Sequence, residues 1–351
     1  MTEATSPLSR GERAPDFVLA GADGTPTRFY AKAGGVPAVL VHAGPPSLAA
    51  VRELAEGLGD CVPDQVTVHL VEQGRLASED GLPFPAFLDA EGKIAAVYRA
   101  VGAPTVFVLD PNLRVLEAFR LDDGRAAARR ILDVIDTLPQ VEAMEIAAQA
   151  PVLLIANALD DATCAQLIDA WETWGNVETG VEQSTAGRRE DTRQAQFKRR
   201  RDHTITDPEL SQRIAVTLGR RIMPEIQKAF SFRATRFEGF KVGCYDASTG
   251  GFFKAHRDNL SPTTAHRRFA LTLNLNDDYV GGQLRFPEYG PHLYRPAAGA
   301  ALIFSCSHLH EVLDVTAGRR FVLLSFLSGE HDADRADASA DARQSGRGGE
   351  S

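Results

Sequence analysis

The sequence contains little cysteine, and the four cysteines that it has form no recognisable pattern. Cys61, Cys164, Cys244 and Cys306 are scattered along 351 residues without a CxxC pair. A disulfide framework or a thiolate zinc site would need paired or regularly spaced cysteines. Neither is therefore indicated, and we expect all four to be small buried residues.

Long apolar runs and a targeting segment are also missing. No apolar run reaches the roughly 18 residues that suggest a membrane-spanning helix. The first residues, MTEATSPLSRGERAPDF, contain no basic segment followed by an apolar stretch and a cleavage site. We therefore expect a soluble cytoplasmic protein without a membrane partner.

Positive charge is not in excess either. The 38 Lys and Arg residues are outnumbered by 47 Asp and Glu residues, which gives a formal net charge of −9. A nucleic-acid partner is therefore not expected. With 44% hydrophobic residues, a chain of this length can bury the cores of two domains. Residues 331–351 lack apolar content, and we expect this tail to be disordered.

The first 145 residues alternate between buried strands and amphipathic helices, which is typical of an α/β domain. The predicted elements are a strand at 36–42, a helix at 46–59, a strand at 66–73, a hairpin at 104–120 and a helix at 126–140. The segments ERAPDFVLAGADGTPTRF and FPAFLDAEGKIAAVYRAVGAPTVFVLDPNLRVLEAF resemble the peroxiredoxin-type thioredoxin fold, and the likeness covers residues 10–140.

The resemblance implies an inactive domain. In that family the peroxidatic cysteine lies in the first turn of the helix that follows the strand at 36–42, where the helix N-terminus stabilises a thiolate. This chain reads AGPPSLAAV there, and Cys61 lies near the opposite end of the helix. Docking or substrate recognition and a retained scaffold both remain open as roles for this domain.

Residues 146–330 have a different pattern. A helix is predicted at 160–174, and Asp207 and Pro208 begin a second amphipathic helix that we expect Pro224 to kink or break. Short strands are predicted at 237–245, 267–276, 282–286, 299–305 and 319–327. Strands this short and closely spaced favour a β-sandwich or jelly roll with flanking helices.

His256 and Asp258 lie two residues apart in GFFKAHRDN, so on a strand both would point to the same face. Alone, such a pair is also compatible with a surface hydrogen bond. A histidine from SCSHLHEVLDVTAGRR would complete two histidines and one carboxylate, a set that leaves positions open on a non-haem iron. Parity on a strand does not decide between His308 and His310.

A 2-oxo acid that filled the open positions would need a cation for its distal carboxylate, and arginine suits a carboxylate best. Arg319 and Arg320 point to opposite faces of the predicted strand, so only one can face inward.

Three segments resemble the prolyl 4-hydroxylase type of Fe(II)/2-oxoglutarate oxygenase, and the likeness covers residues 160–328. They are KVGCYDASTGGFFKAHRDN, RRFALTLNLNDDYVGGQLRFPEYG and RPAAGAALIFSCSHLHEVLDVTAGRRFVLLSFL. In that family a basic residue follows the distal histidine by ten places, which selects His310 and Arg320 here. The resemblance implies a double-stranded β-helix, with His256, Asp258 and His310 as metal ligands and Arg320 and Tyr245 as contacts of 2-oxoglutarate.

The resemblance also implies Fe(II), 2-oxoglutarate and O2 as cofactor and cosubstrates, with ascorbate as a candidate reductant, and hydroxylation of a C–H bond. The substrate would be a prolyl or other residue of a protein, or a small molecule. A zinc-dependent hydrolase with the same three ligands and a non-catalytic binding module are the alternatives. His308 is expected to be a packed neighbour of the site. His266 and the basic stretch at 188–201 are expected to be solvated or near substrate.

Overall fold

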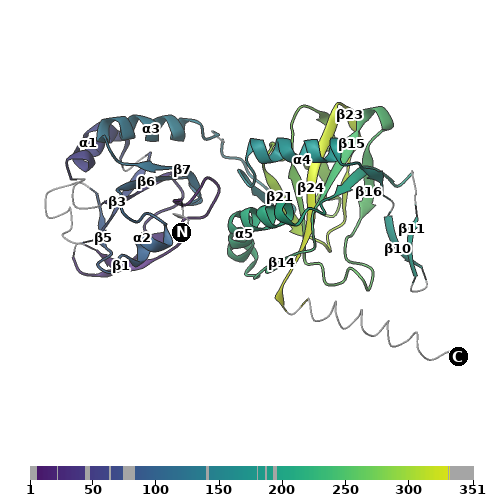
Figure 1. Cartoon of the computed structure of the whole chain (residues 1–351), viewed down its shortest axis with the longest axis horizontal. Helices are drawn as coiled ribbons and strands as arrows, with labels where there is room; N and C mark the ends of the chain where they lie inside the picture. The colour runs from purple at the N-terminus through teal and green to yellow at the C-terminus, as the bar shows by residue number, and fades with distance from the viewer. Residues whose placement is uncertain are drawn as a thin grey trace. The chain divides into compact units, whose positions relative to one another are not determined.

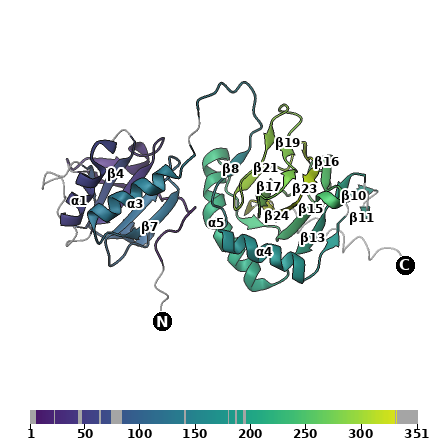
Figure 2. The same cartoon turned by 90° about the horizontal axis from the view of Figure 1, so that it is seen from above.

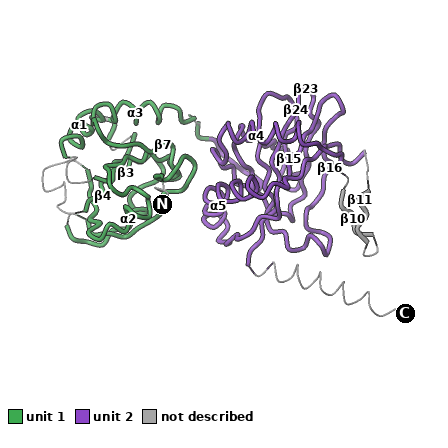
Figure 3. Tube along the Cα trace, in the orientation of Figure 1, with its two compact units in different colours: residues 1–143 green, residues 144–351 purple. Residues whose placement is uncertain are grey.

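The two sequence patterns fold into two separate units, residues 1–143 and 144–351 (Figure 1; Figure 3 colours each unit). The computed structural model describes residues 6–21, 23–43, 48–62, 65–73, 84–139, 142–179, 181–185, 188–192, 196–330 and 332. The predicted disordered tail lies outside the described residues except for Asp332. Within the described chain, no helix combines the length and apolar character that crossing a membrane requires.

The N-terminal unit is built on a seven-stranded sheet in the order β2-β1-β5-β4-β3-β6-β7. The strands are β1 (Val18–Gly21), β2 (Pro26–Arg28), β3 (Ala38–Ala43), β4 (Thr67–Glu72), β5 (Ala86–Leu88), β6 (Thr105–Leu109) and β7 (Val115–Arg120). β3 runs parallel to β4 and antiparallel to β6, and β6 runs antiparallel to β7. This is the strand arrangement of a thioredoxin-like fold.

Helices cover both faces of this sheet. On one face α1 (Leu48–Leu58) and α3 (Gly124–Asp136) bury their apolar stripes, and on the other α2 (Lys93–Val97) packs with the aromatic cluster around Phe17, Phe29 and Tyr98. α1 and α3 approach so closely that a Cβ at Gly124 would lie 2.0 Å from the carbonyl oxygen of Ala50. The predicted α/β fold is confirmed.

The position of the peroxidatic cysteine in the related family, residues 44–47 and the first turn of α1, lies partly outside the described residues. The short 3-10 helices of this unit are η1 (Phe29–Ala31) and η2 (Gly59–Cys61). Cys61 therefore follows the C-terminal end of α1, as the sequence predicts.

Two histidines are buried in the sheet of this unit. His42 on β3 and His69 on β4 lie on the same face, since His69 pairs with Leu40 and His42 with Val71. Neither ring has a hydrogen-bond partner within the described chain, and the rings pack against aromatic side chains. Burial lowers the pKa of His42 to about 3 and that of His69 to about 4, so both are neutral at pH 7.

Acidic pH is therefore expected to destabilise this unit. An unfolded histidine has a pKa of about 6.5, so below that pH the unfolded chain binds protons that the folded chain excludes. Stability falls as the pH drops from 6.5 toward 4, by about 2 kcal/mol per histidine at pH 5. The variant His42→Leu keeps only one of the two histidines, so the loss of stability on acidification should be roughly halved. Hydrogen exchange of the backbone amides of β3 and β4 in the whole chain measures this loss. His292 is exposed, so His292→Leu should leave the pH dependence of this stability as it is in wild type. An unchanged pH dependence in His42→Leu would contradict the conclusion that His42 is buried in its neutral form.

The C-terminal unit consists of two antiparallel sheets. The large sheet has the order β8-β21-β17-β24-β15-β13-β9, and β14 also pairs with β24. Its strands are β8 (Leu153–Ile155), β9 (Val177–Glu178), β13 (Arg201–Thr204), β14 (Arg236–Phe237), β15 (Lys241–Asp246), β17 (Phe269–Asn274), β21 (Ala301–Ser305) and β24 (Arg319–Ser328).

The small sheet has the order β12-β16-β22-β19-β20. Its strands are β12 (Lys198–Arg199), β16 (Phe252–His256), β19 (Leu284–Arg285), β20 (Leu293–Tyr294) and β22 (His310–Val312). One hairpin, one further pair of strands and a 3-10 helix lie outside these two sheets: β10 (Val181–Thr185) with β11 (Arg188–Thr192), β18 (Val280–Gly281) with β23 (Val315–Ala317), and η4 (Ala247–Thr249). Along β15, β16, β17, β19, β21, β22 and β24 the chain alternates between the large and the small sheet, so the predicted double-stranded β-helix is confirmed.

Two helices cover the outer face of the large sheet, α4 (Asp161–Thr173) and α5 (Pro208–Phe230) (Figure 2). Asp207 caps α5 as predicted, because its carboxylate accepts a hydrogen bond from the Glu209 N–H. The predicted break at Pro224 is wrong, since α5 continues through it. Ile222 and Ile226 on either side are buried in the core, and this packing outweighs the loss of one backbone hydrogen bond.

Candidate metal centre

His256 and His310 are brought together by the pairing of two short strands in the small sheet. His256 ends β16, His310 begins β22, and the two residues are direct partners in the antiparallel register. Their ring centroids are 4.2 Å apart. Phe253 stacks on the His256 ring, and Phe304 packs against His310, so an apolar wall surrounds the imidazoles.

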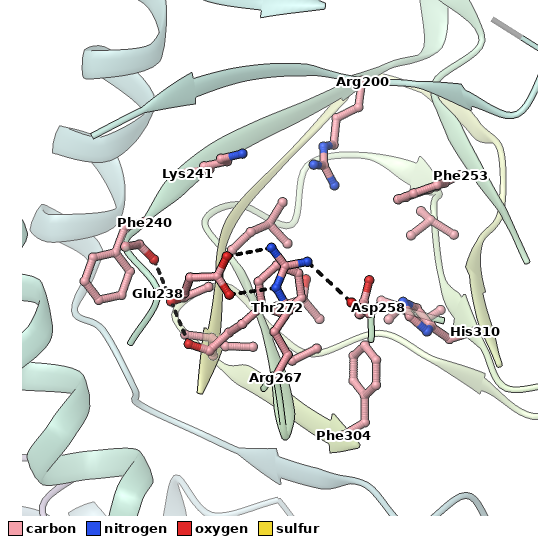
Figure 4. Close-up of a pocket in the computed structure, with 18 of the residues that line it drawn as sticks. Arg200, Glu238, Phe240, Lys241, Phe253, Asp258, Arg267, Thr272, Phe304 and His310 are labelled. Carbon is pink, nitrogen blue, oxygen red and sulfur yellow. Dashed lines mark hydrogen bonds and ion pairs between the residues drawn. The ribbon is translucent and has the colours of Figure 1, made fainter. Parts of the chain in front are cut away.

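Asp258 lies beside His310 in the cavity (Figure 4). Its carboxylate oxygens are 3.5 Å from Nε2 of His256 and 3.4 Å from Nε2 of His310. The prediction that Asp258 shares a strand with His256 is wrong, because β16 ends at His256 and Asp258 occupies the following bend. Its position is fixed instead by its backbone N–H, which donates to the carbonyl oxygen of Cys306 over 2.9 Å.

The hydrogen bonds of the two imidazoles are made by Nδ1 and leave Nε2 of each ring available for a metal. Nδ1 of His256 lies 2.8 Å from the Lys254 carbonyl oxygen, and Nδ1 of His310 lies 3.0 Å from that of His308. Since a carbonyl only accepts, each Nδ1 carries the proton and each Nε2 presents its lone pair toward Asp258. This is the orientation that backbone carbonyls impose on histidines that ligate metals.

The protonation states also suit a divalent cation. Burial lowers the pKa of His310 to about 4, which leaves its ring neutral at pH 7. Burial opposes ionisation of Asp258, but the nearby His310 and His256 outweigh it and hold the pKa of that carboxyl below its usual range. One atom from each of the three residues lies within 4.8 Å of the others. Two imidazoles and one carboxylate fit the ligand set of non-haem Fe(II).

The other two candidate histidines lie outside this cluster. His308 sits in the turn before β22, and its Nδ1 is 3.0 Å from the hydroxyl of Tyr289. His266 lies 3.2 Å from a carboxylate oxygen of Glu238. Neither joins the one metal-ligand group found among the described residues. His308 contributes its backbone carbonyl, which orients His310.

Arg319 and Arg320 point to opposite faces of β24, as the sequence predicts. Arg319 is exposed and pairs with Glu172 at 2.8 Å on the outer face. Arg320 is only 1% exposed, and its Nε and Nη2 donate to Oδ1 of Asn274 over 3.2 and 2.9 Å. Its Nη1 has no partner in the part of the chain that is described. A buried guanidinium with one free donor suits an anionic ligand.

Tyr245 lies beside Arg320, because the two residues are direct partners on β15 and β24. The Arg320 guanidinium carbon is 5.5 Å from the centroid of the Tyr245 ring. The hydroxyl of Tyr245 accepts a hydrogen bond of 3.1 Å from Nη1 of Arg200. Tyr245 is thus a buried aromatic residue whose hydroxyl contacts the Arg200 guanidinium and whose ring lies beside that of Arg320.

A cavity of about 220 Å³ extends from the metal centre between the two sheets. His256, Asp258, His310 and Tyr245 line it, and Arg320 lies behind Tyr245 without being one of the lining residues. Three further cations line the cavity that sequence reasoning did not assign to the site: Arg200, Lys241 and Arg267 (Figure 4). Lys241 could have been found, since it shares a face of β15 with Tyr245 four residues on.

Comparison with known proteins identifies this region. The family model described as the 2OG-Fe(II) oxygenase superfamily matches residues 240–328. A PKHD-type hydroxylase from Caulobacter sp. (strain K31) is 42% identical over 67 residues, which are 18% of this chain and 30% of the Caulobacter protein. The chain thus spans less than a third of that relative's length.

Solved structures resemble each unit separately. A prolyl-4-hydroxylase from Pseudomonas putida is 18% identical, with a TM-score of 0.40, and the match covers 51% of this chain and 92% of that one. The peroxidoxin BcpB from Mycobacterium tuberculosis is 19% identical, with a TM-score of 0.33, and the match covers 38% of this chain and 99% of that one. The segment that matches the 2OG-Fe(II) oxygenase superfamily model lies within the C-terminal unit.

Proposed function

We propose that this protein is an Fe(II)- and 2-oxoglutarate-dependent dioxygenase that hydroxylates a C–H bond, with His256, Asp258 and His310 as the iron ligands. The observation that carries the proposal is the convergence of two imidazole Nε2 atoms and one carboxylate in the lining of a cavity. The match of residues 240–328 to the 2OG-Fe(II) oxygenase superfamily supports the choice of metal and cosubstrate.

Iron and 2-oxoglutarate, when bound, supply the oxidising chemistry: one oxygen atom of O2 enters the substrate C–H bond, and the other enters succinate as 2-oxoglutarate loses carbon dioxide. The protein holds and orients these groups. Arg320 would bind the distal carboxylate of 2-oxoglutarate through its free Nη1. Tyr245 would donate a hydrogen bond from its hydroxyl to the same carboxylate.

The cavity walls have a second task, which is to keep bulk water away from the reacting atoms. Phe253 and Phe304 flank the imidazoles, and Leu324 lines the cavity on the large sheet. Apolar walls of this kind strengthen the electrostatic contacts inside the cavity and limit side reactions. Turnover without substrate would be slow, and ascorbate would serve as the reductant that restores Fe(II).

The substrate is proposed to be a prolyl or other residue of a protein, with a small molecule as the second possibility. The relative from Caulobacter is itself named a hydroxylase, which supports the reaction class. The thioredoxin-like unit has no cysteine at the position of the peroxidatic residue. Docking of a protein partner and a retained scaffold are the two roles proposed for it, because the fold alone does not decide between them.

Succinate formation by the whole chain tests this proposal. The metal-free protein is loaded anaerobically with Fe(II) and 2-oxoglutarate, O2 is admitted, and succinate is measured by mass spectrometry. Succinate should form with Fe(II) and not with Zn(II), and it should increase when the correct substrate is added, with a gain of about 16 Da in that substrate. A chain that binds no 2-oxoglutarate but hydrolyses a substrate with Zn(II) would instead be the zinc hydrolase.

A further inference from the structure

We infer that Arg200 is a positioning residue of this site: it fixes the hydroxyl of Tyr245 as a hydrogen-bond donor toward a carboxylate bound in the cavity. The inference rests on the proposed function, since the carboxylate is that of 2-oxoglutarate. Arg200 lies in the basic stretch at 188–201, which the sequence favours as a solvated loop, yet its side chain is only 10% exposed. Its burial beside the cavity calls for an explanation.

An ion pair with Asp202 fixes the position of the Arg200 guanidinium. Nε and Nη2 of Arg200 donate to the two oxygens of Asp202 over 2.6 and 2.8 Å, which is the two-pronged geometry of a strong guanidinium–carboxylate pair. Asp202 is itself 1% exposed and accepts a further hydrogen bond of 2.6 Å from the Thr179 hydroxyl. The Arg200 partner holds the pKa of Asp202 at about 2 in spite of its burial, so the pair stays ionised at neutral pH.

The path of the Arg200 side chain depends on a glycine in the neighbouring strand. Gly243 on β15 is the direct partner of Asp202 on β13. A Cβ at Gly243 would lie 2.9 Å from Cδ and 3.1 Å from Nε of Arg200. The missing side chain leaves the space through which Arg200 crosses the inner face of β15 and reaches Tyr245 two residues further on.

The hydrogen bond that Arg200 makes to Tyr245 has only one direction. A guanidinium donates and cannot accept, so the Tyr245 oxygen accepts from Nη1 of Arg200 over 3.1 Å. The hydroxyl proton of Tyr245 is then left to donate elsewhere. No acceptor for it is found in the described part of the chain. The free Nη1 of Arg320 is a second donor beside the same ring.

The Tyr245 hydroxyl and Nη1 of Arg320 are unused donors on two neighbouring side chains, and the oxygens of a carboxylate are suitable acceptors for them. Without Arg200, the Tyr245 hydroxyl could rotate and donate to a water or to the backbone, and part of the affinity for the carboxylate would be lost. Arg200 therefore acts through Tyr245, and its effect should vanish when the Tyr245 hydroxyl is absent. This dependence separates positioning from a general contribution of charge.

A double-mutant cycle on the whole chain tests the inference. Binding of radiolabelled 2-oxoglutarate to the Mn(II)-loaded protein is measured anaerobically by equilibrium dialysis for wild type, Arg200→Gln, Tyr245→Phe and the double variant. Tyr245→Phe should weaken binding by about tenfold, the loss of one hydrogen bond to a charged group. Arg200→Gln should weaken it by a similar factor, and the double variant should bind no more weakly than Tyr245→Phe.

Controls keep this outcome specific. Arg199→Gln removes the neighbouring exposed arginine, which donates to the Thr249 carbonyl, and should leave binding unchanged. If Arg200→Gln unfolds because Asp202 keeps only Lys198, at 3.8 Å, as a cationic partner, Arg200→Gln with Asp202→Asn removes the charges of the Arg200–Asp202 pair together. At saturating 2-oxoglutarate the kcat of Arg200→Gln should equal that of wild type, with KM alone raised.

Two results would overturn the inference. In the first, Arg200→Gln weakens 2-oxoglutarate binding by the same factor in wild type and in Tyr245→Phe, which would show that Arg200 acts independently of the Tyr245 hydroxyl. Wild-type affinity in Arg200→Gln would show that it does not act at all. Both differ from a failure of the proposed function, in which the wild-type chain itself would bind no 2-oxoglutarate.

Discussion

Asp258→Ala is expected to abolish Fe(II)-dependent turnover of 2-oxoglutarate. Asp258 supplies the only carboxylate in the candidate ligand cluster found among the described residues, and two imidazoles alone bind a hard divalent ion weakly. Losing an outer partner of a metal ligand already costs about ten- to a hundredfold in affinity or activity. Removing the ligand itself should exceed that, so succinate formation should fall by more than about a hundredfold.

The measurement combines bound iron, succinate formation and thermal unfolding in the same preparation. Asp258→Ala should keep its fold, because the hydrogen bond that places this residue is made by its backbone N–H to Cys306 and survives the substitution. Asp277→Ala removes an exposed carboxylate of the same unit and should retain full iron content and turnover. Normal succinate production by a folded Asp258→Ala would contradict the assignment of the metal centre.

The sequence was sufficient where spacing along one strand decides the outcome. Arg319 and Arg320 are adjacent, and the alternation of side chains on a strand predicts that one faces outward and the other inward. In β24, Arg319 faces outward and Arg320 faces inward. The choice between His308 and His310 could not be made by alternation. It depends on where β22 begins, and the structure begins it at His310, so His308 stays in the preceding turn.

The sequence was insufficient where long-range contacts decide. Asp258 is placed by a backbone hydrogen bond to Cys306, and no local pattern encodes a contact across that separation. Arg200 lies in a run of basic residues whose local composition is typical of a solvated loop. Its burial depends on Asp202 and Gly243, which meet only when β13 pairs with β15. Strands of two or three residues, such as β12, β20 and β22, are too short for periodicity to detect.

Arg320→Gln is expected to weaken 2-oxoglutarate binding by about a hundredfold. A buried charged hydrogen bond to a carboxylate contributes about 2–5 kcal/mol when one partner is truncated, and about 2.7 kcal/mol corresponds to a hundredfold. Asn274 occupies Nε and Nη2 of Arg320 and leaves Nη1 for the ligand. Arg320→Lys keeps the charge but not the planar donor set, so it should restore only part of the affinity.

Arg319→Gln is the matched control for this variant, because the two arginines differ by one position and by the face of β24 on which they lie. Both substitutions remove one positive charge from the same strand, so the total charge of the protein changes equally. Arg319 pairs with Glu172 on the outer face, and its removal should leave the affinity for 2-oxoglutarate unchanged. Equal weakening by both variants would mean that the site responds to overall charge. Weakening by Arg320→Gln alone would tie binding to the inward-facing guanidinium, which Asn274 orients.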